Sequence, residues 1–416
     1  MSFSIFIFLV SYFFSLSVLS TEIFPLEKFV SSALKKSPDL SRILEKIDNA
    51  YADALEIENL NNPNLEVNVN PLNNEFDNRV LEIEIEQPVR FSKFNERKSY
   101  ANALRKLADT EQKAKILEII HSVTRGYIAF WILQEKEKLL KKYIDYVVNK
   151  KKLLEQASHD GIVDITDVIL LEAESIRLLE NLRFISTKKK LGASNLTRIA
   201  GVSEVSFVAV KPKAPEIPNF DYVIQLIDNE GSTRKILESR KLLAEKRYEV
   251  AKKDSKLFDF APRFIFKQDF ETNDLSLMLG VNISLPIWDR NNIELHRAIA
   301  ERRSAINNLD ALNARGFFNV ISSLLEKIQQ FKQSFDSYQE KIIPAWEEIQ
   351  TITEKKFESG QVPIMELFQM REKIDEIHKE SLQRYISFIE AWLDLESLIG
   401  VSINNGIFSL EKEQKK

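Results

Sequence analysis

The sequence predicts a mainly α-helical fold with a small β part, built from two copies of one unit. Glycine and proline are scarce, at 10 and 12 of 416 residues, against ordinary usage of about 7% and 5%. Because these residues punctuate most turns, their scarcity predicts few turns and long elements. The second observation is a set of landmarks that recurs in the same order almost 200 residues later.

The repeat is defined by five landmark pairs. Gly161 and Gly360 are 360 − 161 = 199 residues apart, and the motifs "RIAGVS" and "SLIGVS" end 199 residues apart, at Ser203 and Ser402. Two proline pairs follow the same interval: Pro63 and Pro262 are 199 residues apart, and Pro88 and Pro286 are 198 apart. The motifs "RILE" and "KILE" begin 193 residues apart, at Arg42 and Lys235. The sequence therefore predicts a first repeat over 21–209, a Pro-rich linker over 210–220, a second repeat over 221–403 and a tail over 404–416.

The N-terminus, "MSFSIFIFLVSYFFSLSVLSTEIF", carries no charge before Glu22. This pattern predicts a secretory signal peptide over 1–20, cut after Ser20, although a basic residue at its start is missing. A membrane anchor is the alternative, but the apolar run is shorter than the ~20 residues that a helical span needs. No later segment is predicted to be a transmembrane helix.

Each repeat shows the same order of elements. A helix comes first, over 39–61 and 232–256, and two short extended stretches follow. A helix of about 60 residues comes next, over 95–157 and 291–357, roughly 90 Å long at 1.5 Å per residue. The glycine turn follows, and then a helix of about 37 residues, over 163–199 and 363–399.

The long helices carry the seven-residue repeat of a coiled coil. In the second repeat the apolar positions alternate spacings of four and three, at Leu324, Ile328, Phe331, Phe335, Tyr338, Ile342, Ala345, Ile349 and Ile352. In the first repeat the same pattern is weaker, at Leu140, Tyr143, Val147 and Leu154. Pro344 is expected to kink its helix, because proline removes a backbone hydrogen bond.

The extended stretches at 64–70, 80–88, 262–270 and 275–286 alternate apolar and polar residues. In "VLEIEIEQP", for example, Leu81, Ile83 and Ile85 oppose Glu82, Glu84 and Glu86. A half-buried sheet in a soluble domain gives this alternation, and so does a membrane β-barrel, whose strands run ~9–11 residues. Four strands cannot close a barrel, so the second interpretation requires oligomerisation, and a trimer would give twelve strands.

Composition argues against several classes of function. The net charge of −4 gives no electrostatic case for nucleic acid binding, and the absence of cysteine excludes disulfides and thiolate metal sites. The four histidines, His121, His159, His296 and His378, show no metal-ligand spacing and are expected to be surface or packing residues. There is no nucleophile elbow, P-loop or dinucleotide fingerprint. We therefore expect no enzymatic activity, no cofactor and no metal site.

In this order, the motifs resemble those of the TolC-like outer membrane efflux proteins of Gram-negative bacteria. The resemblance covers about 22–403. It rests on the tandem repeat, the strand-pair and long-helix order, the turns before "DITDVILLEAE" and "PIMELFQMREK", the endings "RIAGV" and "SLIGV", and "SLPIWDRNNIELHRAIAE". "EQPVRFSKFNERKSYANA" is similar to the CzcC/CusC-like cation-efflux branch.

The resemblance implies a homotrimer in the outer membrane. Each protomer would give four strands to a twelve-stranded β-barrel in outer membrane lipid, and its helices would form a tunnel through the periplasm. The implied function is a passive exit duct of a tripartite efflux system, for substrates that include metal cations. Its partners would be a periplasmic adaptor protein and an inner-membrane RND-type pump. The rival class is a periplasmic structural coiled coil without a barrel.

The two glycine turns are the candidate periplasmic tips and adaptor-docking sites. Gly161 and Gly360 permit the positive φ that a helix C-cap often requires. Acidic side chains suit a helix N-terminus and proline suits its first position, so these residues could equally be helix caps alone. The candidates are Gly161, Asp164, Asp167, Gly360, Pro363 and Glu366. The resemblance also implies a pore aperture at Glu366 and Gln369, where Gln369 replaces an acid of the family pattern.

A polar face of the predicted sheet carries Glu66, Glu82, Glu84 and Glu86. If this face lines the barrel lumen, a trimer stacks these carboxylates in rings, and acidic rings favour cations. The alternative is the solvated face of a two-faced sheet.

Overall fold

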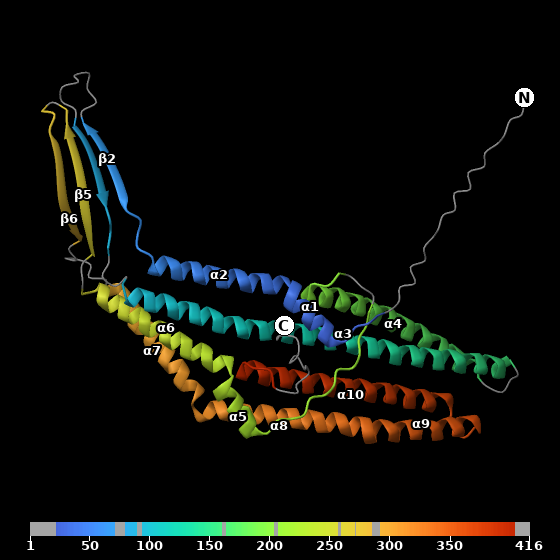
Figure 1. Cartoon of the computed structure of the whole chain (residues 1–416). Helices are drawn as coiled ribbons and strands as arrows, with labels where there is room; N and C mark the ends of the chain where they lie inside the picture. Colours follow the sequence, from blue (N-terminus) through green and yellow to red (C-terminus); the bar gives the residue numbers. More distant parts are fainter. Residues whose placement is uncertain are drawn as a thin grey trace, which may run out of the picture.

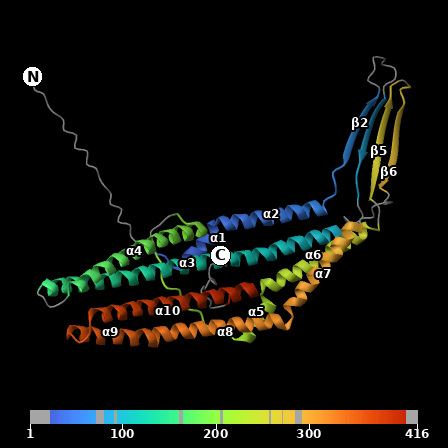
Figure 2. The same cartoon turned by 180° about the vertical axis from the view of Figure 1, so that it is seen from behind.

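The computed structural model describes residues 22–70, 80–89, 94–159, 164–203, 207–256, 259–270, 272–284 and 292–403. The molecule is a long layer of helices with a four-stranded antiparallel sheet at one end (Figure 1). The helices of two hairpins end at the opposite end, as the reverse view also shows (Figure 2). The mainly α-helical fold with a small β part is thus confirmed.

The first repeat contains α1 (Leu26–Lys36), α2 (Pro38–Glu58), β2 (Asn64–Asn70), β3 (Val80–Glu86), α3 (Glu96–His159) and α4 (Ile165–Ala200). The second repeat contains α5 (Phe220–Asn229), α6 (Ser232–Asp254), β5 (Asp259–Asp269) and β6 (Leu275–Ser284), followed by the long helical segments and α10 (Ile364–Ile399). Short helices α1 and α5 precede the predicted first helices and were not expected. A small parallel pair, β1 (Glu22–Ile23) with β4 (Phe207–Val208), joins the start of the first repeat to its end.

The second long helix is not continuous, so the prediction of one helix over 291–357 was wrong. It consists of α7 (Asn292–Leu312), α8 (Arg315–Ser337), a π-helical turn (Tyr338–Ile342) and α9 (Ile343–Glu358). The chain leaves the helix at Asn313 and Ala314, and the π-turn lies immediately before Pro344. A π-turn takes in one extra residue, which accommodates the proline without ending the helix.

The π-turn changes which residues face inward. Up to Phe335 the predicted heptad positions are at least partly buried, as in the case of Ile328, but Ala345, Ile349 and Ile352 are exposed. Ile343 and Thr353 are buried beyond the turn. The heptad prediction is therefore wrong after the π-turn, because the inserted residue shifts the frame by one. In the first repeat Leu140, Tyr143, Val147 and Leu154 are all buried, as predicted.

Two hydrophobic clusters hold the repeats together. The larger joins α1, α3, α5, α8 and α10 around large aromatic side chains such as Tyr127, Tyr385 and Trp392. The smaller, closer to the hairpin turns, joins α3, α4 and α10 through residues such as Val147, Leu171 and Leu367. One stretch of α3, within Glu96–Gln156, reaches a mean hydropathy of 1.3 and is long and apolar enough to cross a membrane, contrary to the expectation that no later segment would be. It is 61% buried inside the protein, as a core helix would be.

Candidate functional site

The four-stranded sheet has one apolar and one polar face, as predicted. Its order is β2-β3-β5-β6, and the register places Leu65 opposite Ile85, Ile83 opposite Phe266, and Phe264 opposite Leu279. The apolar face is largely bare, although Leu81, Ile83 and Phe266 on the two central strands are partly buried. Ten of its side chains are 44–85% exposed: Leu65, Val67, Val69, Ile85, Phe264, Leu275, Leu277, Leu279, Val281 and Ile283. The sheet extends beyond the helices (Figure 1), so no described helix covers this face.

The polar face contains the four predicted glutamates, and they do not share one environment. Glu66 lies directly opposite Glu84, and Glu82 lies opposite Lys267. Glu84 is buried, with 7% of its surface exposed, whereas Glu66 is exposed. The carboxylates are therefore not a uniform acidic surface.

Arg263 on β5 binds two of these carboxylates. Its Nε and Nη2 contact Glu84, and its Nε lies 3.0 Å from Glu86 Oε2. Like charges opposite each other destabilise a sheet, and a buried carboxylate needs a partner. Arg263 supplies that partner to Glu84 across the boundary between the two repeats. The sequence prediction missed Arg263, although its place on the polar face of 262–270 could have indicated it.

Both outer strands of the sheet have an unpaired edge. β2 pairs only with β3, and β6 pairs only with β5, among the strands that the structure describes. Such edges present unsatisfied backbone groups along 7 and 10 residues. The sheet is therefore open on both sides.

The second hairpin tip has the geometry expected of a glycine turn. Gly360 has φ +72, in the left-handed region. Its N–H donates to Phe357 O at 2.9 Å, and the next N–H, of Gln361, donates to Lys356 O at 2.8 Å. These two bonds form the Schellman motif that ends many helices. The chain-reversal function predicted for Gly360 thus has a local structural basis.

The first hairpin tip is described from Asp164 onward, and Gly161 lies outside the described residues. Asp164 is the N-cap of α4: its carboxylate accepts a hydrogen bond from Thr166 N at 2.9 Å and another from the Thr166 hydroxyl. The Thr166 hydroxyl and then its backbone N–H lower the pKa of Asp164. Asp167 lies in the first turn. The capping interpretation therefore has direct contacts to support it, and docking at these carboxylates stays a prediction.

At the second tip, Pro363 is the N-cap of α10 and not its first residue, so its expected position was off by one. Glu366 lies in the first turn, and both Glu366 and Gln369 are exposed. They lie on the side of α10 opposite the buried Leu367 and Phe368. Their position is compatible with a pore mouth, and that role stays a prediction.

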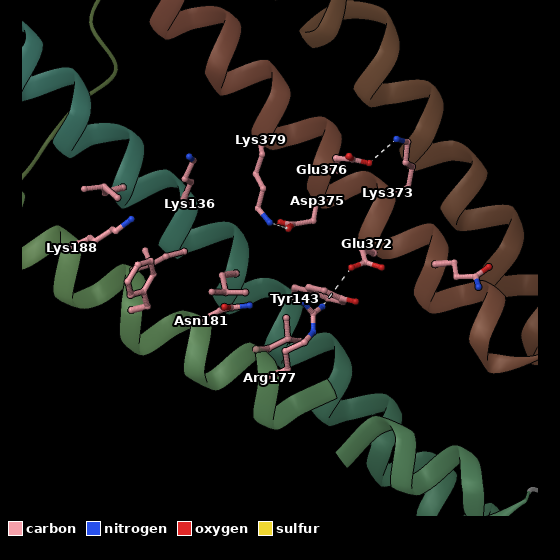
Figure 3. Close-up of a pocket in the computed structure, with 16 residues that line it drawn as sticks. Lys136, Tyr143, Arg177, Asn181, Lys188, Glu372, Lys373, Asp375, Glu376 and Lys379 are labelled. Carbon is pink, nitrogen blue, oxygen red and sulfur yellow. Dashed lines mark hydrogen bonds and ion pairs between the residues drawn. The ribbon is translucent and has the colours of Figure 1, made fainter. Parts of the chain in front are cut away.

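A groove separates the α3–α4 hairpin from α10. It has a volume of about 650 Å³ and contains apolar residues such as Tyr143 and Leu178. Figure 3 shows Arg177 of α4 reaching across the groove to Glu372 of α10, and these side chains lie 3.6 Å apart. Gln369 also lines this groove. The groove thus lies next to the predicted aperture.

Arg371 on α10 joins the two hairpins near the tips. Its guanidinium lies 5.7 Å and 5.6 Å from the ring centres of Tyr143 and Tyr146 on α3, which is the range of a cation–π contact. It also donates to Gln350 Oε1 of α9 at 3.0 Å. The sequence did not single out Arg371, because its partners are distant along the chain.

The fold matches those of solved outer membrane channels. The CmeC channel of Campylobacter jejuni aligns with a TM-score of 0.72 at 14% identity, over 90% of this chain and 85% of that one. VceC of Vibrio cholerae aligns with a TM-score of 0.71 at 15% identity, over 92% and 97%. CusC aligns with a TM-score of 0.72 at 12% identity, over 91% and 92%.

No protein-family model matches the chain, and no curated protein matches it at a significant level. At 12–15% identity the structural similarity shows the fold alone. The expected TolC-like fold is confirmed, whereas CusC scores no higher than the other channels, so a specific cation-efflux branch is not distinguished.

Proposed function

The chain has the fold of the outer membrane efflux channels, and we propose that it serves as the outer membrane component of a tripartite efflux system. Three copies would close a twelve-stranded β-barrel in the outer membrane, continued by a helical tunnel in the periplasm. The protein would be a passive duct, since export energy would come from an inner-membrane pump. We expect no enzymatic activity of its own.

The bare apolar face of the sheet carries this proposal. A soluble sheet buries its apolar face against a helix or a second sheet, because exposed apolar surface costs about 25 cal/mol per Å². Here the apolar face is exposed and charged residues occupy the other face. Lipid outside and water inside reverse the arrangement of a soluble protein, as in membrane barrels. The rival periplasmic coiled coil without a barrel does not account for this face.

The two unpaired edges of the sheet support closure of a barrel by further copies of the chain. The sheet ends in β2 on one flank and β6 on the other. The helices beside it follow the order α2, α3, α6, α7, so α2 lies on the β2 flank and α7 on the β6 flank (Figure 1). Two different edges that face opposite ways fit a head-to-tail ring, which closes and satisfies both strand edges.

The hairpin tips are the expected contact with a periplasmic adaptor that leads to an RND-type pump. The tip-side ends of α3, α4, α9 and α10 lie at the far end of the molecule from the sheet, where a partner from the inner membrane would meet them (Figure 2). Metal cations are the first substrate class to test, because the polar face carries four glutamates. Drugs and other small molecules are the alternative cargo.

The experiment is membrane fractionation combined with heat-modifiable gel migration. We expect the protein in the outer membrane fraction, with a trimer band in unheated SDS samples that converts to monomer on heating. A soluble periplasmic monomer would overturn the proposal. A deletion strain exposed to metal salts and, separately, to drugs would then identify the cargo, and adjacent genes for an adaptor and a pump would identify the partners.

A further inference from the structure

The groove between the α3–α4 hairpin and α10 is cationic, although the whole chain has a net charge of −4. Its lining includes five cationic side chains and three carboxylates: Lys136, Arg177, Lys188, Lys373, Lys379, Glu372, Asp375 and Glu376. Three of these cations are paired within the groove: Lys379 with Asp375 at 2.5 Å, Lys373 with Glu376 at 2.6 Å, and Arg177 with Glu372 at 3.6 Å. The excess positive charge therefore comes from Lys136 and Lys188.

Neither Lys136 nor Lys188 has a carboxylate at ion-pairing distance within the part of the chain that the structure describes. The glutamate next to Lys136, Glu137, is instead bound by Lys141 and Lys189. Lys136 is partly buried, so water does not fully replace the missing partner. The Lys188 ammonium lies 4.2 Å from the ring centre of Phe184, which is a cation–π contact and leaves its charge uncompensated.

These two lysines lie at the same level of the hairpin. Lys189 of α4 contacts Glu137 of α3, and each of these residues is the sequence neighbour of one of the two lysines. Figure 3 shows Lys136 and Lys188 towards one end of the groove, with Arg177 and Glu372 towards the other. The two unpaired charges are thus gathered at one end.

Lys379 of α10 lies at this level too. The rings of Trp131 on α3 and Tyr385 on α10 lie 5.3 Å apart, and Lys136 follows Trp131 by 136 − 131 = 5 residues. Lys379 precedes Tyr385 by 385 − 379 = 6 residues on the antiparallel helix. The pKa of Lys136 is lowered, first by burial and then by the ammonium groups of Lys379 and Lys188. Three ammonium groups from three helices therefore converge here, and their repulsion would be relieved by an anion.

The remainder of the groove wall is largely apolar. It is lined by Leu133, Leu140, Tyr143, Leu178, Phe184 and Ile185. Lys136 and Tyr143 are 143 − 136 = 7 residues apart, or about 10 Å along α3 at 1.5 Å per residue. The groove volume of about 650 Å³ falls within the range of small-molecule sites, about 300–1,000 Å³. The groove thus joins a cationic end to an apolar wall of small-molecule length.

We propose that this groove binds an amphipathic organic anion, whose carboxylate or sulfonate head lies between Lys136 and Lys188 and whose apolar body lies along Leu140 and Phe184. The head would form charge-assisted hydrogen bonds with both ammonium groups. The ligand is a dissolved molecule and not a membrane lipid, because the groove lies towards the tips, away from the sheet (Figure 1). The site is formed by one chain, so the inference goes beyond the proposed function and does not depend on trimers.

The test is fluorescence titration of the full-length protein in nanodiscs with anilinonaphthalene sulfonate (ANS), an aromatic sulfonate, after subtraction of empty nanodiscs. Phenylnaphthylamine, which has the same rings without the sulfonate, is the neutral comparison. We expect saturable ANS binding that Lys136→Gln and Lys188→Gln each weaken about tenfold, equivalent to about 1.4 kcal/mol. Binding of phenylnaphthylamine should not change in either variant. Lys136→Arg keeps the charge and should retain ANS binding.

The matched controls are Lys138→Gln on α3 and Lys190→Gln on α4, because both lysines are exposed and lie outside the groove lining. Both should bind ANS like the wild type. The proposal would be overturned by unchanged ANS affinity in the Lys136 and Lys188 variants, by an equal loss in the controls, or by an equal loss of phenylnaphthylamine binding.

Photolabelling locates the bound probe directly. An azide-bearing naphthalene sulfonate should label peptides of α3, α4 and α10 that line the groove, and excess ANS should suppress this labelling. Labelling confined to other parts of the chain would overturn the site. Because the groove lies within one chain, a protein that forms no trimers would overturn the proposed function and would still bind ANS here.

Discussion

His121 Nε2 lies 3.0 Å from Glu396 Oε2, and both side chains are almost completely buried. The contact joins α3 of the first repeat to α10 of the second. His121 Nδ1 also lies 2.9 Å from Ser397 Oγ, and Glu396 Oε1 accepts from Ile403 N at 2.9 Å. The pair thus connects the long helix, the end of α10 and the residues after it. His121 was expected to be either a surface or a packing residue, and its burial shows that it is a packing residue.

We predict that His121→Ala destabilises the protein, because Glu396 would remain buried without its imidazole partner. A buried acceptor left without its hydrogen-bond donor costs about 1–3 kcal/mol. The measurement is the temperature at which the trimer dissociates on gels, which should fall clearly. The control is Arg125→Ala: Arg125 lies on the same helix and meets Asp394 of α10 at 3.3 Å, but both are about half exposed. An exposed pair contributes about 0–1 kcal/mol, so equal effects of the two changes would contradict the prediction.

Gly360→Val should disturb the second tip and weaken export while trimers still form. The cost comes from the backbone, since φ is +72 and a Cβ would meet nothing within 4 Å. A left-handed conformation costs an L-residue about 1–2 kcal/mol. The measurement is the resistance of the strain to exported compounds, with trimer formation followed in parallel.

The matched control for Gly360→Val is Gly316→Ala, because Gly316 also has open space around a Cβ but no positive φ. It should leave export unchanged. Normal export by Gly360→Val would show that the shape of this tip has no part in docking. The same substitution at Gly161 tests whether the two tips are equivalent.

The Asp164 cap should make the start of α4 sensitive to acid. Its pKa is lowered by the Thr166 hydroxyl and N–H, so the folded state favours the ionised form. The contribution is fully present above the ordinary carboxylate pKa of about 3.9 and disappears as the pH falls through the lower folded value. The protection of the amide hydrogens in the first turn of α4, measured relative to their intrinsic exchange rate at each pH, should therefore fall in Asp164→Ala at neutral pH, and only at low pH in the wild type. An Asp164→Asn variant, which can still cap, should behave like the wild type at neutral pH.

Arg263→Gln should weaken the sheet, because it removes the cation that binds Glu84 and Glu86. A buried charged acceptor left without its partner costs about 1–3 kcal/mol. Lys267→Gln, on the same face of the same strand, is the control and should have a smaller effect. Combining Arg263→Gln with Glu84→Gln should recover stability, because no unpaired buried charge then remains. Equal trimer dissociation temperatures for the Arg263 and Lys267 variants would show that the ion pairs are unimportant.

Regular patterns in the sequence were sufficient to predict most of the fold. The alternation in "VLEIEIEQP" predicted the correct faces of β3, and the 199-residue interval predicted two hairpins whose second helices match α4 and α10. One feature is an alternation within a strand and the other a repeat across the chain, and a single sequence displays both directly.

The contacts that the sequence did not reveal depend on residues far apart in the chain. His121 meets Glu396 only because two repeats fold against each other, and Arg371 meets Tyr143 and Tyr146 for the same reason. The frame shift after Phe335 was missed because apolar residues happen to continue the old heptad at Ile349 and Ile352. Periodicity cannot register an inserted residue when both frames contain apolar side chains.

Deleting Glu340 tests whether the π-turn absorbs one extra residue. Glu340 is exposed and lies within the π-turn, so its loss should convert the segment to ordinary α-helix with one residue fewer. Phe335 and Ile343 would then be seven residues apart, so α9 keeps its rotation and Ile343 and Thr353 stay buried. The trimer should therefore dissociate at nearly the wild-type temperature. The control is deletion of Glu348, which is exposed and lies in α9 beyond the π-turn. The residues after Glu348 should then rotate by about 100°, which moves Thr353 out of its buried position and lowers the dissociation temperature. Equal losses in the two deletion variants would show that the π-turn does not hold an extra residue.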